Sequence, residues 1–261
     1  MIIITGSSGF IGGNFAKKLK KNNLILIEQN NCFESLENFP SWDRVSLIIH
    51  QGAISHTTET DINKLHKYNV DYTLKLFEKA IEYQIPVKYA SSASVYGNTN
   101  DQINPLNYYA ITKLQIDYFV QDNLDKFSSI QGFRYFNVYG KGEDHKGDQA
   151  SPVSKFTKQI KQTGKLKLFE GSNNFLRDFI CVDDVIEVVL NNNVGSGIYN
   201  LGTGNQVSFQ HVAEEVAKKE NGTIELIPFP DHLKNKYQTY TCANMDWCNY
   251  KFKTIEEYLQ N

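Results

Sequence analysis

A tyrosine and a lysine stand four residues apart in the segment Tyr109-Ala-Ile-Thr-Lys113, and no other pair in the chain has this order and spacing. On a helix, positions i and i+4 share a face, so the lysine ammonium would lie beside the phenol. A neighbouring cation favours the phenolate and brings the tyrosine pKa closer to neutral pH. The pair could then take a proton from a substrate hydroxyl group. Tyrosine and lysine are both frequent in this chain, so the spacing alone would be weak evidence.

Ser92 supplies a third polar group, at the end of an apolar stretch that is typical of a buried strand. From there it could hydrogen-bond the oxygen atom that reacts. A single serine would carry little weight. Here the strand-end serine follows a glycine turn and precedes the tyrosine–lysine pair, and this order together predicts a catalytic site for Ser92, Tyr109 and Lys113.

A glycine turn directly follows the apolar N-terminal stretch and contains Gly6, Gly9 and Gly12. Glycines allow a tight turn and let the backbone approach a pyrophosphate, which would then lie at the positive N-terminus of the next helix. Such a pattern also occurs in purely structural turns. Its place after the first strand favours a dinucleotide site.

The end of the second apolar stretch carries Glu28 and Gln29. An acid at this point commonly accepts hydrogen bonds from the adenosine ribose, and it would repel a 2′-phosphate. An exposed carboxylate without a ligand is the alternative. No arginine or lysine occurs between Glu28 and Arg44 to neutralise a phosphate. The residues favour NAD slightly and leave NADP open as the cofactor.

The elements that would position these residues alternate regularly along the first half of the chain. Expected strands cover residues 1–5, 24–28, 45–50, 87–92 and 130–136, and expected helices cover 13–22, 60–83 and 108–121. Strands alternating with helices predict an α/β fold with a doubly wound parallel sheet.

From about Gly140 onwards the pattern of expected strands and helices becomes less regular. Short strand patterns (LKLFEG, GIYNLG and IELIPF) are interspersed with expected helices around Asp183–Asn193 and Phe209–Glu220. We therefore predict a Rossmann dinucleotide-binding domain over residues 1–140. A smaller substrate-binding lobe over 141–261 would be interleaved with its sheet.

Composition excludes several classes of function. The 261 residues carry a formal net charge of −2, which gives no sign of a nucleic-acid partner. The four cysteines have no zinc spacing, so no metal site is expected and reduced thiols are the simplest interpretation. No stretch has the length and apolarity of a membrane span, and MIIITG is no signal peptide. We expect a cytoplasmic protein without a membrane partner.

Four further segments are distinctive: HQGAISHTTE (50–59), FRYFNVYG (133–140), HKG (145–147) and KLFEGSNNFLRDFICVDDV (167–185). With the glycine turn and the tyrosine–lysine pair, they make the chain resemble the extended short-chain dehydrogenases/reductases, and more narrowly the ADP-L-glycero-D-manno-heptose 6-epimerases. The resemblance runs through most of the chain. It implies a nucleotide-sugar epimerase with a tightly bound, recycled NADP or NAD, acting in lipopolysaccharide biosynthesis. We also expect a homo-oligomer.

The resemblance also implies roles for individual residues. Tyr109 and Lys146 would be the two acid/base groups on opposite faces of one carbon, C6″, which is oxidised and then reduced from the other side. The implied cofactor contacts, besides the glycines and Glu28 with Gln29, are Phe10, Ile11, Gln51, Gly52, Ala53, Ile54, Ser55, Asn69, Tyr109, Lys113 and Val138. The implied substrate contacts are Ser92, Asn137, Lys146, Phe169, Glu170, Gly171, Ser172, Arg177 and Tyr237.

One departure from that family leaves alternatives open. Between Glu28 and His50 there is room for little more than a loop and one strand, where the family has an extra strand and helix. Another nucleotide-sugar epimerase, dehydratase or reductase is one alternative, and a catalytically silent dinucleotide-binding protein is the other. The acid pair expected of a dehydratase after the serine cluster is absent, and a silent protein would not need Ser92, Tyr109 and Lys113 together.

Overall fold

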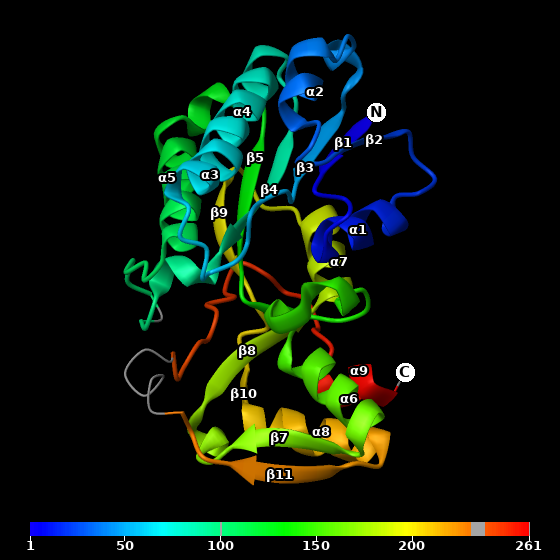
Figure 1. Cartoon of the computed structure of the whole chain (residues 1–261). Helices are drawn as coiled ribbons and strands as arrows, with labels where there is room; N and C mark the ends of the chain where they lie inside the picture. Colours follow the sequence, from blue (N-terminus) through cyan, green and yellow to red (C-terminus); the bar gives the residue numbers. More distant parts are fainter. Residues whose placement is uncertain (100, 231–237, 261) are drawn as a thin grey trace. The chain divides into compact units, whose positions relative to one another are not determined.

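The computed structural model describes residues 1–99, 101–230 and 238–260. Its contacts divide the chain into two units, each described here by itself (Figure 1). The first unit consists of Met1–Val95, Ile103–Tyr135 and Val189–Asn200, and the second of Tyr96–Gln102, Phe136–Val188 and Leu201–Asn261. The chain passes between them several times, whereas the sequence-based division was drawn at residue 140.

The first unit is built on a six-stranded sheet with the order β2-β1-β3-β4-β5-β9. β1 pairs in parallel with β2 and β3, and β4 pairs in parallel with β3 and β5. The strands are β1 (Ile2–Thr5), β2 (Leu24–Ile27), β3 (Leu47–His50), β4 (Val87–Ser92), β5 (Ile130–Tyr135) and β9 (Gly197–Leu201). The predicted doubly wound parallel sheet is confirmed. The GIYNLG stretch, grouped above with the smaller lobe, forms β9 at the edge of this sheet.

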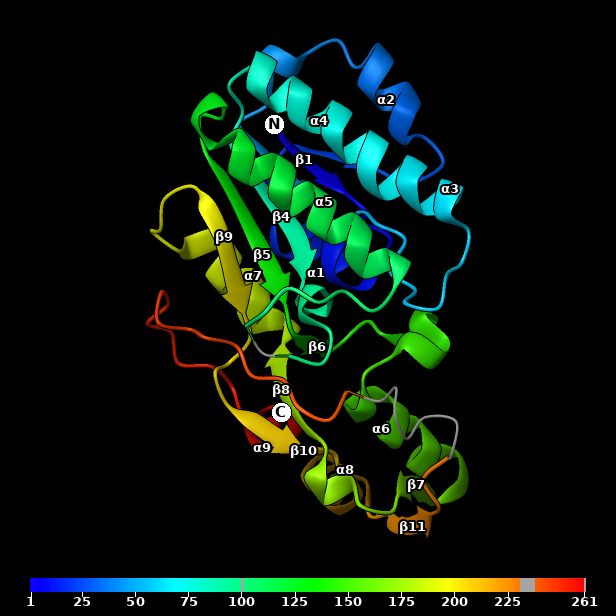
Figure 2. The same cartoon turned by 90° about the vertical axis from the view of Figure 1, so that its left-hand side faces the viewer.

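Helices cover both faces of this sheet. In Figures 1 and 2, α4 and α5 run side by side on one face, and α1 lies on the other. The helices are α1 (Phe10–Lys18), α2 (Cys32–Asn38), α3 (Ile62–Leu65), α4 (Tyr72–Glu82) and α5 (Tyr108–Asp122), with 3₁₀ turns at Trp42–Arg44, Ala93–Tyr96 and Leu124–Lys126. The helix expected over residues 60–83 is interrupted by a π-helical segment, His66–Asp71.

The segment after β2 differs from expectation. We predicted little more than a loop there, but Cys32–Asn38 forms the short helix α2. Its Cys32 and Leu36 are buried in the core cluster, together with Trp42 of the following turn. Burial of three apolar side chains explains why seven residues fold into a helix that would be marginal in isolation.

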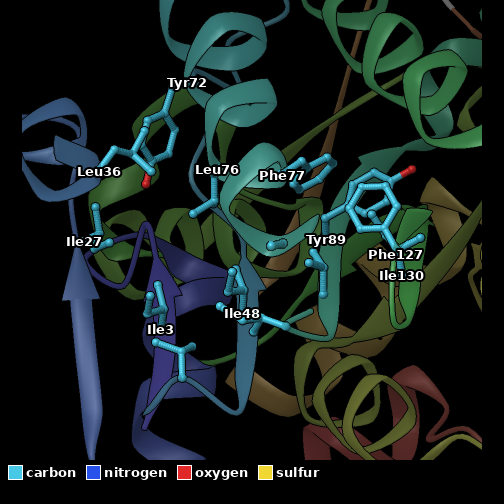
Figure 3. Packing of buried hydrophobic residues seen from close by; sticks show 14 of the residues in the cluster. Ile3, Ile27, Leu36, Ile48, Tyr72, Leu76, Phe77, Tyr89, Phe127 and Ile130 are labelled. Atoms are coloured by element: carbon cyan, nitrogen blue, oxygen red, sulfur yellow. The ribbon is translucent and has the colours of Figure 1, made fainter. Parts of the chain in front are cut away.

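The core of the first unit lies between one face of the sheet and the helices α2, α4 and α5 that cover it. Figure 3 shows side chains from β1, β2, β3 and β4 meeting those of α4. Phe77 of α4 is fully buried and contacts Tyr89 and Phe127 edge to face. This packing fixes β4 against the helical layer, and β4 ends at the expected catalytic serine.

The second unit contains a three-stranded sheet, β10-β8-β6, and a parallel pair, β11-β7. Its core is formed by apolar residues of α6, α8 and α9 with those of β7 and β8. The elements are β6 (Asn137–Tyr139), α6 (Pro152–Thr163), β7 (Lys165–Phe169), β8 (Leu176–Cys181), α7 (Val182–Asn191), β10 (Gln206–Ser208), α8 (Phe209–Glu220), β11 (Thr223–Ile227) and α9 (Ile255–Gln260), with 3₁₀ segments at Asp144–Gln149 and Ser172–Asn174.

Candidate active site

The glycine turn between β1 and α1 is packed against the backbone that follows β3. Gly6 has φ +66°, and a Cβ there would lie 2.6 Å from the Gly52 Cα. A Cβ on Gly12 would lie 2.2 Å from the Gly6 carbonyl oxygen. Only glycine fits at these two positions. Gly9 caps α1 without a side-chain hydrogen bond, so no cap side chain occupies the N–H groups of this helix end.

The two α1 residues implied as cofactor contacts, Phe10 and Ile11, are the first of that helix. Phe10 is buried and Ile11 is half-buried. The turn and the uncapped helix end together fit a bound pyrophosphate.

Glu28 follows β2 and is hydrogen-bonded to the glycine turn. Its Oε1 accepts from the Ser7 hydroxyl and, at 2.9 Å, from the Ser8 N–H. Its Oε2 accepts from the Ser8 hydroxyl at 2.6 Å. The carboxylate is therefore held beside the turn, where an adenosine ribose would be recognised. Gln29 is exposed at the start of the next loop.

The loop after β3, residues 51–55, is held by Asn69 from the π-helical segment. The Asn69 side chain accepts from the Ile54 N–H at 2.8 Å and donates to the Ile54 carbonyl at 3.0 Å. It also donates to the Thr112 hydroxyl on α5 at 3.1 Å. Asn69, predicted as a cofactor contact, thus fixes the loop that carries the other predicted contacts Gln51, Gly52, Ala53, Ile54 and Ser55.

Gln51 is the one residue of this loop with an incomplete set of hydrogen bonds. Its amide atoms are buried beside the Tyr135 hydroxyl, without a hydrogen bond of normal geometry to any described residue. Buried polar atoms normally have partners. A polar ligand group, such as a nicotinamide ribose or carboxamide, would supply the hydrogen bonds that the Gln51 amide lacks, so the loop fits the expected cofactor.

Ser92, Tyr109 and Lys113 come together as the sequence predicted. Tyr109 lies in the first turn of α5, which begins where the Asn107 side chain accepts from the Ala110 N–H at 2.9 Å. Ser92 at the end of β4 lies beside the Tyr109 phenol, and its hydroxyl lowers the pKa of that group. The Lys113 Nζ lies 6.0 Å from the centre of the Tyr109 ring and donates to the Ala90 carbonyl at 2.7 Å.

The surroundings of these groups shift their proton affinities. Burial lowers the pKa of Lys113 to about 8, while the negative charge of Asp117 acts in the opposite direction. Burial raises the pKa of Tyr109, the Ser92 hydroxyl lowers it, and the negative charge of Asp117 raises it further. A phenol with a serine donor and a lysine cation alongside is suited to exchanging a proton with a substrate hydroxyl.

Asp117 is a residue that the sequence analysis missed. It is fully buried one turn beyond Lys113 on α5, where its carboxylate accepts hydrogen bonds from β4 and β5. The available signal was the spacing Tyr109, Lys113, Asp117, which places all three on one helix face.

In the second unit, Lys146 lies in the 3₁₀ segment after β6, close to a buried acid. The Lys146 Nζ is 3.7 Å from the carboxylate of Glu143. Burial lowers the pKa of Lys146, and Glu143 opposes this. Glu143 itself accepts from the Gly140 N–H at 3.0 Å and from the Ser151 N–H at 2.6 Å, so it ties together both ends of the loop that carries Lys146. The sequence analysis also missed Glu143.

Asn137 and Val138 are on β6 of the same unit. The Asn137 amide donates to the Asp178 carbonyl at 3.1 Å and to the Thr241 hydroxyl at 3.2 Å. These bonds attach β6 to β8 and to the C-terminal segment. Contacts of Asn137 with substrate and of Val138 with cofactor stay predictions.

The remaining predicted substrate contacts lie at the end of β7 and on β8. Phe169 packs edge to face against Phe229, and the buried Ser172 donates its hydroxyl hydrogen to the Phe169 carbonyl. Glu170 and Gly171 lie in the turn between them, where Gly171 has φ +79°. Arg177 is a buried cation whose guanidinium lies 5.9 Å from the Phe209 ring centre. Tyr237 lies outside the described residues.

The described part of the chain contains no cluster of side chains able to hold a metal ion. Nor does any helix within the described ranges combine the length and apolarity that crossing a bilayer requires.

The family and its members match this chain over most of its length. The model of the NAD dependent epimerase/dehydratase family matches residues 2–202. A curated ADP-L-glycero-D-manno-heptose-6-epimerase of Brachyspira hyodysenteriae is 39% identical over 284 residues, covering 94% of this chain and 89% of that protein.

Solved structures agree with this relationship. The ADP-L-glycero-D-manno-heptose-6-epimerase of Helicobacter pylori superposes with a TM-score of 0.83 at 26% identity, covering 99% of this chain and 93% of that one. A UDP-glucose 4-epimerase of Thermotoga maritima gives the same TM-score at 21% identity over 99% and 96% of the two chains, a likeness of fold. The expected resemblance to heptose epimerases is confirmed. The chain belongs to the NAD-dependent epimerase/dehydratase family, and it is an enzyme that works with a nicotinamide cofactor.

Proposed function

We propose that this enzyme interconverts ADP-D-glycero-D-manno-heptose and ADP-L-glycero-D-manno-heptose by inverting C6″. The observation that carries the proposal is the 39% identity, over nearly the whole chain, with a protein named for this activity. Ser92 lies beside Tyr109, and Lys113 shares a helix face with that tyrosine; this arrangement supports the chemistry that the reaction needs.

Tyr109 is the first acid/base group in this scheme. Its phenolate takes the proton of the C6″ hydroxyl, and the bound nicotinamide supplies the accompanying oxidation and the later reduction at that carbon. Ser92 donates a hydrogen bond to the oxygen that changes charge. Lys113 stabilises the phenolate because a cation beside it favours the charged form.

Lys146 is the second acid/base group. Inversion requires that the ketone be reduced from its opposite face, so a second group must deliver the proton to the oxygen there. A lysine with a depressed pKa both gives up and takes back a proton more readily near neutral pH, as a reversible epimerisation requires, and burial depresses the pKa of Lys146. Glu143 holds the Lys146 ammonium in place because the Glu143 carboxylate is itself fixed by hydrogen bonds from the loop backbone.

NAD is the cofactor we propose. The carboxylate of Glu28 lies beside the glycine turn and would repel a 2′-phosphate, whereas it can accept hydrogen bonds from the two ribose hydroxyls of NAD. Mass spectrometry of the supernatant after denaturation identifies the bound dinucleotide. Release of NADP in place of NAD would overturn this part of the proposal.

The activity is tested by incubating the purified protein, without added cofactor, with ADP-D-glycero-β-D-manno-heptose and resolving the two epimers by NMR. We expect interconversion that is lost in Tyr109→Phe and in Lys146→Met. Matched controls are Tyr118→Phe, an exposed tyrosine of the same helix, and Lys158→Met, an exposed lysine of α6. Bound cofactor without interconversion would contradict the heptose assignment.

A further inference from the structure

A buried carboxylate lies beneath the Tyr109–Lys113 pair and has no direct part in the scheme above. Asp117 is 0% exposed. Its Oδ1 accepts from the Tyr89 hydroxyl at 3.0 Å. Its Oδ2 accepts from the Ser91 hydroxyl at 2.9 Å and from the Arg134 Nε at 2.8 Å. An ionised carboxylate with three donors and a cationic partner is well stabilised in such a place.

These contacts tie α5 to the strand that ends at Ser92. Tyr89 and Ser91 of β4 donate to Asp117, and Lys113 donates to the carbonyl of Ala90 between them. Three successive residues of β4 are therefore bonded to two residues one turn apart on α5. Ser92, which lies beside Tyr109, is the next residue of β4.

Room for the network is made by a glycine on the neighbouring strand. The Tyr89 ring lies over Gly132 of β5, and a Cβ at that position would be 2.3 Å from the Tyr89 hydroxyl oxygen. Arg134, two residues further along β5, points to the same carboxylate. The sheet is thus shaped to deliver both donors to Asp117.

The negative charge of Asp117 also interacts with the Lys113 ammonium. The charged and titratable groups around the Lys113 ammonium are Asp117 on the same helix, Tyr109 before it, and His50 on β3. Burial and the charge of Lys113 lower the pKa of His50 to about 3, so this imidazole is neutral near pH 7. Asp117 is the anion in this group.

We propose that Asp117 is a positioning residue of this active site. Its buried negative charge, held in place by Arg134, keeps Lys113 a cation beside Tyr109. Its hydrogen bonds hold α5 against β4. The inference rests on the proposed function for its consequence in catalysis. Its electrostatic part concerns the protein alone.

The direction of the effect follows from the opposing influences on Lys113. Burial brings the pKa of Lys113 down to about 8, and Asp117 raises it. Without the carboxylate the ammonium loses its proton at a lower pH. A neutral lysine no longer stabilises the phenolate, so activity is lost first on the alkaline side of the pH profile. Asp117 also raises the pKa of Tyr109, so its removal moves the acidic limb to lower pH, and the alkaline limb is the one that reports on Lys113.

Asp117→Asn keeps the shape of the side chain and removes the charge. Asp117→Asn/Arg134→Gln removes both charges of the ion pair, so that a fold weakened by the loss of the Asp117 charge alone does not prevent the test. Asp122→Asn is the control because Asp122 is exposed at the end of the same helix. Circular dichroism establishes that each variant is folded.

Two measurements on the holoenzyme complete the experiment. The first follows the titration of Lys113 by NMR of lysine labelled with ¹³C at Cε, with the signal assigned by its loss in Lys113→Arg. We expect the midpoint to move to lower pH in Asp117→Asn and in the double variant, and to be unchanged in Asp122→Asn. An unchanged midpoint in the two Asp117 variants would overturn the inference, whether or not the enzyme acts on heptoses.

The second measurement is the pH profile of epimerisation. At a pH one unit above the wild-type Lys113 midpoint, we expect the Asp117 variants to lose more activity than at pH 6.5, by about tenfold for each pH unit by which the midpoint falls. An equal loss at every pH would show a purely structural role and contradict the proposal. A wild-type protein without epimerase activity would overturn the proposed function and leave the NMR test decisive for Asp117.

Discussion

Replacing Ser92 with alanine removes the hydroxyl that lies beside the Tyr109 phenol. This hydroxyl lowers the pKa of Tyr109 against the opposing effect of burial. Its loss therefore raises the pKa of the phenol, so a smaller fraction is phenolate at any pH below that value. We expect the acidic limb of the pH profile to move to higher pH.

The size of the effect follows from the hydrogen bond that the Ser92 hydroxyl would donate to the phenolate in the reacting state. A hydrogen bond to a charged group is worth about 1.5–3 kcal/mol. If this stabilisation is expressed in the transition state, the rate falls about 10- to 150-fold. Ser92 also accepts from the Ser94 N–H at 3.2 Å, so alanine costs a little stability as well. That second loss does not depend on the protonation of Tyr109.

The assay measures initial epimerisation rates of the holoenzyme from pH 6 to 10. Ser128→Ala, an exposed serine before β5, serves as the control with an unchanged profile. Ser92→Thr keeps a hydroxyl and should recover part of the rate. An acidic limb that stays in place in Ser92→Ala, or a rate within a factor of two of wild type, would refute the reasoning.

Three further changes have outcomes that the structure predicts. In Gly12→Ala the new Cβ would lie 2.2 Å from the Gly6 carbonyl oxygen, so the purified protein should release little cofactor on denaturation; a full complement would contradict the close packing of the turn. Glu143→Gln removes a charge that raises the pKa of Lys146, so Lys146 loses its proton at lower pH. The alkaline limb of the pH profile of epimerisation should therefore move to lower pH. A profile identical to wild type would count against this pairing. Phe77→Ala empties a fully buried position and should lower the free energy of unfolding by about 3–5 kcal/mol in urea denaturation, while a loss below 1 kcal/mol would show that the core collapses into the space.

Much of the first unit could be predicted from its sequence because each local signal agreed with the fold. The glycine turn, the strand ending at Ser92 and the helix carrying Tyr109 and Lys113 all lie where their patterns indicated. Each of these signals is a short local pattern, and the geometry of a parallel sheet brings the strand ends to one edge.

The rest could not be predicted, because it depends on contacts between distant segments. Helix α2 forms because Cys32 and Leu36 are buried in a core that the local sequence does not reveal. Asp117 and Glu143 appear in the sequence as ordinary acids, and only their burial with donors from other strands and loops gives them a role. The π-helical segment that places Asn69 over the 51–55 loop has no pattern in the sequence that distinguishes it from a regular helix.

The central claim is that C6″ is oxidised and then reduced by one cofactor that stays bound. It is tested most directly with ADP-D-glycero-β-D-manno-heptose carrying deuterium at C6″, incubated with the purified protein in ordinary water and without added cofactor. The proposal predicts that the epimerised product keeps its deuterium at C6″, because the same bound cofactor removes and returns it. Product that has exchanged this deuterium for solvent hydrogen would contradict the proposal.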